Sequence, residues 1–550
     1  MVSAGCGTLI SNNQPSPPVK AISTAQRWVA AWPCAAGLAV ACLLFAIQHV
    51  SRQRTLLGVG VEHDFAAHFG PEAQRILAGE PLRLDFHPPG YAFAEALGRL
   101  MTSSWLDGGL WISGISAMTL LVASLVTFKR LAGTTAAWGA LIACACSTIF
   151  LSSASTASSD MMFAALICLT LALTVQALSA PDRLQLWLIS GVVAGCAFLT
   201  RTNGLIAVAV LVTPFLIPAG QSKRWRNFAV VAAAFFLPLV LWVLYATATT
   251  SPLMPRDNYL NLAVAAYGEG PGAWGDQWVP PHFRGIIDVL TYDPARMMSR
   301  FVRRLLSLPL TFLHTLTWPP LVALAVPGVV LMLWRRRTSA FLVYLLVVGC
   351  ITLLSGIVGF EARYHLVLIP LMGAMAGVTF DYFLDRFALK RVLRTFLTSA
   401  VLLVVAIMAG KAYAPVLSTL ETTAQFEFAE AIPHILQQTE FDARIYARKT
   451  NLSFETGRLD RLIADVPTVT LLHRDLCLHL EPDDPAYLYF GTEERRYRNE
   501  LARDLAAADP LPWLEVIAKG LKTEWTLYRI RLYEPNFSQG QQCPSEPHTG

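Results

Sequence analysis

Charged residues are scarce in this 550-residue chain: Asp, Glu, Lys and Arg make up 15% of the sequence, and hydrophobic residues make up 54%. So little charge excludes an ordinary soluble protein, in which about a quarter of the residues are charged. The length excludes a single membrane span, because one crossing of the hydrocarbon core takes only about 20 residues. The composition therefore predicts a polytopic membrane protein.

Three other features are also lacking. The first 26 residues are polar and rich in Ser, Pro and Asn, without a recognisable signal-peptide cleavage pattern. No basic stripe of the kind that binds nucleic acid is present, so we expect no nucleic-acid partner. No internal repeat is visible, which weakens the case for a transporter built from inverted repeats.

The ten cysteines are scattered, and most lie in or before apolar runs. Cys144 and Cys146 lie inside one such run without companion ligands, which favours a packing role over metal binding. Cys477 and Cys543 lie in the polar C-terminal region, where a disulfide can form if that region is exported.

Eleven apolar runs are interpreted as membrane spans. They cover residues 28–50, 109–128, 133–152, 160–179, 186–201, 204–218, 227–248, 318–334, 340–358, 366–384 and 395–413. Lys20 and Arg27 precede the first run, which predicts a cytoplasmic N-terminus by the positive-inside rule. An odd number of spans then predicts an external C-terminus. We expect a multi-pass protein of the plasma membrane, in a bacterial setting the inner membrane.

The predicted fold is all-α and polytopic, with about 11 transmembrane helices and a small external α/β domain at the C-terminus. Residues 1–26 form a polar cytoplasmic N-terminus, and residues 27–413 form the transmembrane domain, with external loops at 51–108 and 249–317. Residues 414–550 form the soluble domain, with 14 Lys and Arg against 21 Asp and Glu. Strands are predicted there at 443–447, 468–472 and 523–533, and an interfacial helix at 295–320.

Ionisable residues lie at the external ends of several predicted spans, where charge is costly and therefore indicates function. Asp64 and His87 belong to the first external loop, and Arg201 lies at the tip of a tight hairpin predicted between 186 and 218. The other polar residues at these external ends are Asp160, Asn203, Glu361, Arg363 and Tyr364.

Such a set suits the transfer of a group from a phosphate leaving group to a hydroxyl or amine. A carboxylate near the acceptor can take its proton. Guanidinium and imidazolium groups can hold phosphate oxygens and stabilise the charge that develops on them. Arginine is apt because its planar fork binds phosphate oxygens bidentately and stays charged.

Each charged residue also has a structural interpretation. Asp64 could be a solvated loop carboxylate, and Asp160 could be an acid that favours the start of a helix. Arg201 could extend toward the interface, and Arg363 could anchor a turn there. These alternatives remain open at the level of the sequence.

A divalent metal is a further alternative in the first external loop. Glu62, His63 and His68 lie close together in the sequence, but they match no defined ligand spacing. No metal site is therefore assigned and no cofactor is certain, while a divalent metal stays an open alternative.

Three motifs resemble those of GT-C glycosyltransferases that use polyprenyl-phosphate sugars, a superfamily that includes protein O-mannosyltransferases and lipid A aminoarabinose transferases. The first is an acid after span one, followed by A-x-x-I-L-x-G and F-H-P-P-G-Y. GVVAGCAFLTRTNGL (191–205) is similar to their G-x-x-x-G-x-x-x-L-T-R segment, and EARYHLVLIP (361–370) to their R-Y-x-x-x-x-x-P turn. The resemblance covers roughly residues 30–410 and implies a GT-C fold.

The resemblance implies that Asp64 is the catalytic base or the carboxylate that orients the acceptor, and that Asp160 is a second catalytic acid. It further implies two groups: Arg201, Arg363, His87 and Tyr364 at the donor phosphate, and Asn203, Glu361 and Tyr91 at the substrate. Two positions depart from the pattern. Many relatives have Asp-Glu where this chain has Asp64-Phe65, and a Lys where it has His87, which makes phosphate contact there pH-dependent.

We therefore expect a membrane glycosyltransferase that moves a sugar from a polyprenyl-phosphate donor to a lipid, glycan or protein acceptor on the external face, with inversion. We also expect the protein to contact membrane lipids. The alternatives are a transporter or lipid flippase with a charged outer cavity, and a non-catalytic envelope assembly protein. A flippase should show polar groups at mid-membrane depth, and an assembly protein should tolerate alanine at the charged positions.

Overall fold

The computed structural model describes two parts of the chain, apart from scattered single positions. The first runs over residues 64–386, with gaps at 103, 217–222, 257, 269–282, 316–318, 335–340 and 354–361 and a partial gap at 342–348. The second comprises residues 423–440, 443–447, 485–491, 513–521 and 524–531. The spans predicted at 28–50 and 395–413, the strand at 468–472 and the pair Cys477 and Cys543 lie outside these residues.

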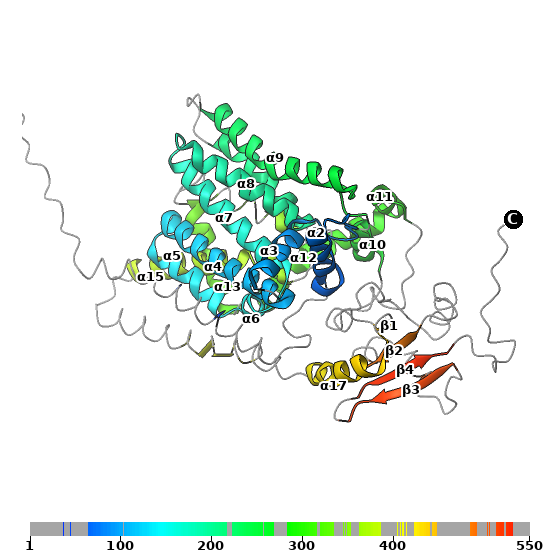
Figure 1. Cartoon of the computed structure of the whole chain (residues 1–550). Coiled ribbons are helices and arrows are strands. Elements are labelled where there is room, and N and C mark those ends of the chain that lie inside the picture. The colour runs from blue at the N-terminus through cyan, green and yellow to red at the C-terminus, as the bar shows by residue number, and fades with distance from the viewer. Residues whose placement is uncertain are drawn as a thin grey trace, which may run out of the picture.

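The first part is a body of helices (Figure 1). It contains the π-helix η1 (Phe65–Phe69), two 3-10 segments, η2 (Thr202–Leu216) and η3 (Ala362–His365), and a series of α-helices. The α-helices are α2 (Gly70–Ala78), α3 (Gly90–Thr102), α4 (Trp105–Ala132), α5 (Thr134–Ala145), α6 (Thr148–Ala154), α7 (Ser159–Ser179), α8 (Leu184–Thr200), α9 (Arg224–Thr249), α10 (Asn258–Tyr267), α11 (Ile286–Tyr292), α12 (Pro294–Thr315), α13 (Pro319–Trp334) and α15 (Leu368–Arg386).

Among the described residues, three helices are long and apolar enough to cross a membrane: α4, α7 and α9. The pair α5 and α6 would make a fourth crossing, although a bend of 71° separates them. Four further segments, α8, η2, α13 and α15, are apolar but shorter. The prediction of a polytopic, mostly helical membrane protein is therefore confirmed in outline, and the number of eleven spans stays a prediction.

The bend between α5 and α6 falls inside the run 133–152, which was predicted as one continuous helix. Ser147 explains the break: its hydroxyl oxygen accepts a hydrogen bond from the backbone N–H of Phe150 at 3.3 Å and so caps a new helix. The segment predicted as a helix at 204–218 is observed as a 3-10 helix, η2, over 202–216.

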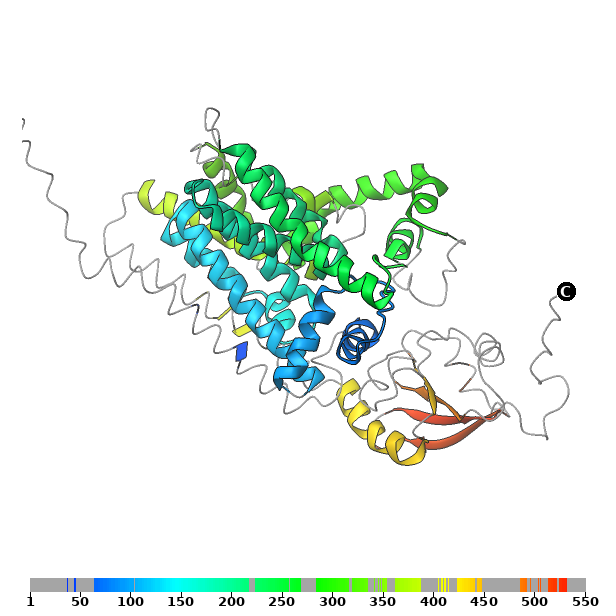
Figure 2. The same cartoon turned by 45° about the horizontal axis from the view of Figure 1, so that its top comes forward.

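The helices differ in how much of their apolar surface is buried. Helices α4, α5, α7, α8 and α15 pack on one another around a buried apolar core. Helix α9 lies at the edge of this body (Figure 2) and packs on α8, while Leu237, Leu241 and Leu244 on its outer face are exposed. Exposed leucines along a long apolar helix suit contact with lipid chains.

The helix predicted at 295–320 is observed as α12 over 294–315, and its interfacial placement stays a prediction. Arg300 and Arg304 donate hydrogen bonds of 2.6 Å to the carbonyls of Gly268 and Ala265, at the end of α10. Basic groups at a helix C-terminus satisfy its unpaired carbonyls. The external loop predicted at 249–317 thus contains two short helices, α10 and α11, before α12.

The second part contains α17 (Thr423–Gln438) and a four-stranded sheet of order β1-β2-β4-β3. Strand β1 (Arg444–Tyr446) pairs in parallel with β2 (Ala486–Phe490), and β4 (Thr526–Ile530) pairs antiparallel with both β2 and β3 (Leu514–Lys519). Strands β1 and β4 agree with the predictions. Strand β2 was missed because all five of its residues are buried, so it lacks the alternating pattern of a half-exposed strand.

Candidate active site

The helical hairpin formed by α7 and α8 brings Asp160 and Arg201 together. Asp160 lies in the first turn of α7, and Arg201 follows the last residue of α8 in an extended conformation. Only four residues connect the two helices, so the start of α7 and the end of α8 lie at the same end of the hairpin. An acid at a helix N-terminus and a base at a helix C-terminus both interact favourably with the helix dipoles.

Asp160 is the centre of a buried ion-pair network. The Nη1 atom of Arg201 lies 2.6 Å from one Asp160 oxygen, and the Nη1 atom of Arg363 lies 3.5 Å from the other. Arg201 also donates a hydrogen bond of 2.7 Å to the hydroxyl of Ser159. The side chains of Asp160 and Arg201 are 3% and 6% exposed, whereas that of Arg363 is 33% exposed. Asp160 therefore fixes both guanidinium groups, and Arg363 remains open to a ligand.

The turn η3 contributes the second arginine and an aromatic ring. Tyr364 lies between the two cations, with its ring centre 5.0 Å from the Arg201 guanidinium carbon and 5.4 Å from that of Arg363. Such cation–π contacts hold guanidinium groups in place without neutralising them. The turn packs against α6 and the start of α7, which explains how residues 200 positions apart meet.

The first external loop reaches the same end of the hairpin. An ideal Cβ on Gly90 would lie 2.6 Å from the carbonyl oxygen of Leu199, so only glycine permits this approach to the end of α8. Gly204 has the same function on the other side of Arg201, because a Cβ there would lie 2.4 Å from the Cα of Phe198. Gly90 therefore allows the H-P-P-G-Y motif to pack on the end of α8, and Gly204 allows the start of η2 to pack on the same end.

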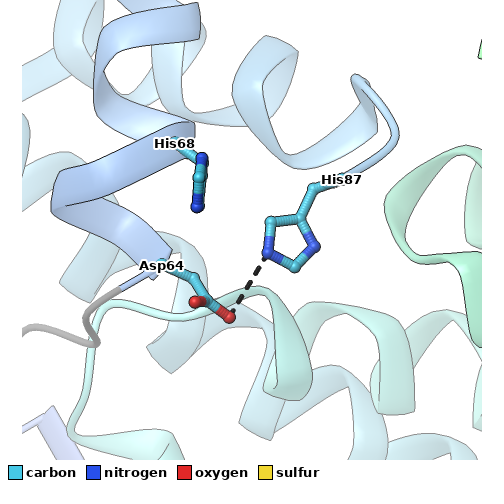
Figure 3. A group of neighbouring side chains, drawn as sticks. All are labelled: Asp64, His68 and His87. Carbon is cyan, nitrogen blue, oxygen red and sulfur yellow. Dashed lines mark ion pairs between the residues drawn. The ribbon is translucent and has the colours of Figure 1, made fainter. Parts of the chain in front are cut away.

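Asp64, His68 and His87 face one another within this loop (Figure 3). Asp64 directly precedes η1, and His68 lies four residues later on the same helical face. His87 comes from the segment between α2 and α3, and its Nε2 atom lies 3.3 Å from an Asp64 oxygen. Phe69 packs against the ring of His87 with centroids 4.7 Å apart, which restrains the orientation of the imidazole.

The segment before His87 is held from several sides. The backbone N–H of Leu82 donates to the hydroxyl of Ser251, and the carboxylate of Glu72 accepts from the backbone N–H of Arg83. Leu84 has φ of 47°, a conformation that costs a residue with a side chain free energy. Strain of this kind persists because the surrounding contacts fix the backbone.

The charged residues of the first loop and of the α7–α8 hairpin end act on each other. Burial raises the pKa of the Asp64 carboxyl, but the hydrogen bond and positive charge of His87 outweigh it. The charges of Arg201 and His68 lower that pKa further, so it lies well below its usual range. Asp64 is therefore ionised at neutral pH, and Arg201 lies near enough to influence it.

A cavity of about 440 Å³ opens beside Asp160 and Arg363. Four residues with hydroxyl side chains are among those that line it, from the bend between α5 and α6 to the start of α7: Ser152, Ser153, Thr156 and Ser158. A volume of this size is typical of small-ligand sites. The cavity presents one cation, one ion-paired carboxylate and several hydroxyls to its occupant.

Known proteins share part of this sequence and its fold. Residues 86–245, which include α3 to α8 and most of α9, match the family model of dolichyl-phosphate-mannose-protein mannosyltransferases. A search of curated protein sequences found no match. Among solved structures, the chain is similar to ArnT from Cupriavidus metallidurans bound to undecaprenyl phosphate. That match has 16% sequence identity, a TM-score of 0.56, and coverage of 92% of this chain and 98% of that one.

The chain is also similar to the oligosaccharyltransferase of Archaeoglobus fulgidus in the apo form, with 11% identity, a TM-score of 0.52, and coverage of 84% of this chain and 70% of that one. This chain has the GT-C fold. The resemblance predicted from the loop and hairpin motifs is thus confirmed, and the family match and the fold together indicate a glycosyltransferase of the GT-C type.

Within this GT-C fold, six of the nine predicted site residues come together. Asp64, His87, Asp160, Arg201, Arg363 and Tyr364 come together at one end of the α7–α8 hairpin. Glu361 lies outside the described residues. Tyr91 is fully buried and packs edge-on against Phe69, which favours packing over substrate contact. Asn203 lies at the start of η2 and is partly exposed.

Three polar residues near these side chains were not among the predicted site residues. Ser159 holds Arg201, and its place beside Asp160 in the sequence was the available signal. His68 was considered only with Glu62 and His63, which lie outside the described residues; its spacing of four from Asp64 would have placed it correctly. Glu95 is fully buried behind the first loop, against Gly108 and Gly109 of α4, and nothing in its local sequence indicates this.

Proposed function

We propose that this protein transfers a sugar from a polyprenyl-phosphate carrier to an acceptor at the external face of the membrane, with inversion at the anomeric carbon. The observation that carries the proposal is the pair of arginines, Arg201 and Arg363, that the buried Asp160 holds beside a hydroxyl-lined cavity. The GT-C fold supports it, and of the similar structures one is described as bound to undecaprenyl phosphate and another as in complex with a dolichol-phosphate and an inhibitory peptide.

The cavity suits the head group of such a donor. A sugar presents several hydroxyls, which the serine and threonine hydroxyls of the cavity can meet as donors or acceptors. The phosphate that links the sugar to the lipid is a singly charged diester, and Arg363 is the exposed cation that can bind it. We therefore place the donor phosphate at Arg363 and the sugar along the hydroxyl-lined wall.

The reaction moves charge toward the arginines. The acceptor oxygen or nitrogen attacks the anomeric carbon from the face opposite the phosphate, and a new glycosidic bond forms. The bond between the anomeric carbon and the phosphate oxygen breaks, and its electron pair stays on the phosphate as additional negative charge. Arg363 and Arg201 stabilise that charge, because fixed cations in a poorly solvated site need no reorganisation as it develops.

Asp64 orients the acceptor. Its carboxylate is ionised and partly exposed, so it can accept a hydrogen bond from the acceptor hydroxyl or amine and receive the proton as the new bond forms. The lowered pKa makes it a weak base, which favours orientation of the acceptor over early proton removal. Asp160, by contrast, is committed to two arginines, so we assign it to positioning them rather than to proton transfer.

The proposal includes the predicted topology. Eleven spans, an external active site, a cytoplasmic N-terminus and a separate external domain over 414–550 remain parts of the proposal. The opposite end of the α7–α8 hairpin supports it: Lys223 and Arg226 lie there beside Asp182, and Arg130 donates to Ser179. Basic groups at that end are typical of a cytoplasmic face. The acceptor is a lipid, a glycan or a protein.

The test is transfer by the Asp64→Asn variant in cells that lack the chromosomal gene. Mass spectrometry of envelope lipids, glycans and proteins should find a product heavier by one sugar residue with the wild-type protein. We expect the variant to lose at least about a hundredfold of this activity, since it keeps the shape but not the charge of the carboxylate.

Asp182→Asn is the matched control, because Asp182 is an aspartate at the other end of the same hairpin and is solvent-exposed. It should transfer normally. Full activity of Asp64→Asn at wild-type expression would remove this carboxylate from the mechanism. A flippase would instead show altered distribution of the carrier lipid across the membrane without a new glycosidic bond.

A further inference from the structure

We propose that Asp64, His68 and His87 bind one divalent transition-metal ion of the Zn²⁺ type. Metal binding itself can be measured without any sugar transfer. Only the role of the bound ion in transfer rests on the proposed function. The three side chains each point a ligand atom toward a common centre (Figure 3).

The geometry fits a single ion. One ligand atom from each residue lies within 4.8 Å of the other two. The Nε2 atom of His87 and an oxygen of Asp64 are 3.3 Å apart. Ligands that bind tetrahedral Zn²⁺ at about 2.1 Å lie roughly 3.4 Å from each other. The pair therefore already has the required separation, and His68 has to approach by only about 1 Å.

The local fold presents His68 and Asp64 as a unit. Both lie on one face of the first turn that begins at Asp64, where η1 adopts the π-helical form. Short π-helical turns are rare and are frequent at functional sites. Phe86 packs edge-on against the ring of His68, with centroids 5.3 Å apart, so the two imidazoles are both held by aromatic neighbours.

The donor set selects the class of metal. Two imidazole nitrogens and one carboxylate oxygen suit Zn²⁺ and related first-row ions, whereas Mg²⁺ and Ca²⁺ prefer oxygen ligands. Three protein ligands also leave a coordination position open, as in catalytic zinc sites. All three side chains are partly exposed, so an ion can enter from solvent. Arg201 does not oppose it strongly, because its charge is compensated by Asp160 at 2.6 Å.

The site gives the first loop a second function in transfer. Asp64 has two carboxylate oxygens, and only one faces His87. The second oxygen remains for the acceptor. The open coordination position belongs to the ion that the first oxygen would bind. A bound ion would therefore hold the acceptor oxygen next to the carboxylate that orients it.

The experiment is a titration of the purified full-length protein, freed of metal by chelation, with Zn²⁺ in an isothermal calorimeter. We expect one ion per chain. His68→Gln, His87→Gln and Asp64→Asn should each weaken binding at least tenfold, because each removes one of three ligands and even loss of supporting contacts costs that much. His434→Gln, a histidine on α17 whose ring packs against Trp525, is the matched control and should bind normally.

A titration with Mg²⁺ completes the design. Binding of Zn²⁺ that is unchanged in His68→Gln, or Mg²⁺ binding as tight as that of Zn²⁺, would overturn the proposal. Each variant is also compared with the wild type for thermal stability without metal, so that loss of fold is distinguished from loss of a ligand. If Zn²⁺ binds as expected and the wild-type protein transfers no sugar, the metal site stands and the proposed function fails. If Asp64→Asn still transfers sugar, only the role of Asp64 in transfer fails.

Discussion

The two ends of the α7–α8 hairpin each carry an ion pair, and the two pairs differ in their surroundings. Asp160 and Arg201 are 3% and 6% exposed, whereas Asp182 and Lys223 at the opposite end are 69% and 40% exposed. The residue types are similar, and Asp182 lies in the turn between the two helices, while Lys223 comes from the start of α9. The difference is therefore in desolvation rather than in chemistry.

That difference separates a functional ion pair from a solvated one. An exposed pair is screened by water and contributes little to stability. A buried pair has lost its water, and in many proteins apolar residues in its place would be equally stable or more stable. The chain keeps Asp160 and Arg201 buried beside a cavity, and this cost is consistent with a site built to hold a charged ligand.

The largest expected effect comes from breaking the buried pair. Arg201→Gln leaves Asp160 buried next to the more distant Arg363 alone, and we expect a loss of roughly 3–5 kcal/mol in the free energy of unfolding. Lys223→Gln at the other end should leave the melting temperature unchanged. Thermal unfolding in detergent measures both. Asp160→Asn combined with Arg201→Gln should recover much of the stability, and equal behaviour of the two single variants would show that burial makes no difference.

A smaller effect should follow from moving the first loop away from the buried end. Gly90→Ala places a Cβ 2.6 Å from the carbonyl oxygen of Leu199, so the loop must shift, at a cost of about 1–3 kcal/mol. Transfer activity should fall with it, because His87 precedes this glycine by three residues. Gly285→Ala is the control, since nothing lies within 4 Å of its Cβ position and its φ of 176° is ordinary extended backbone. A fully active Gly90→Ala variant would contradict the close packing of the loop.

The third effect is a dependence on pH and concerns Glu95, a buried acid near the same end. Neither of its carboxylate oxygens has a hydrogen-bond partner among the described residues, and burial raises the pKa of Glu95 well above its usual value. The folded protein thus holds the proton more tightly than the unfolded chain does. Stability should fall as the pH rises above about 4.5, by at most about 1.4 kcal/mol per pH unit.

Glu95→Gln has no proton to lose, so its melting temperature should depend less on pH than that of the wild type. Melting curves at pH 5, 6, 7 and 8 test this. Parallel pH profiles for the two proteins would mean that Glu95 is already ionised in the fold.

The sequence predicted the members of the site because each stands out locally. Asp160, Arg201 and Arg363 interrupt or border apolar runs, where a charge is conspicuous, and the positive-inside rule placed them at one end. Their pairing could not be predicted, because it depends on how η3 packs against the start of α7. The sequence therefore identified Asp160 as a catalytic acid and did not reveal that two arginines neutralise it.

The cavity and the small C-terminal domain were harder to predict from the sequence, for a related reason. Ser152 ends the run 133–152, which is apolar enough to pass for a span, and Ser153 and Thr156 follow it. The bend at Ser147 brings these three residues to the cavity. Strand β2 has the opposite problem, since burial on both faces removes the alternation that marks a strand. Both features arise from tertiary contacts that no local pattern records.

The central claim is that the buried end of the hairpin, through Arg363, binds the donor phosphate. The direct measurement is equilibrium binding of a short-chain polyprenyl phosphate to purified protein in detergent, compared between wild type, Arg363→Gln and Lys223→Gln. Arg363→Gln should weaken binding about tenfold or more, because a charge-assisted hydrogen bond is worth roughly 1.5–3 kcal/mol, and Lys223→Gln should bind as the wild type does. Unchanged affinity in Arg363→Gln, or a greater loss in Lys223→Gln, would contradict the account.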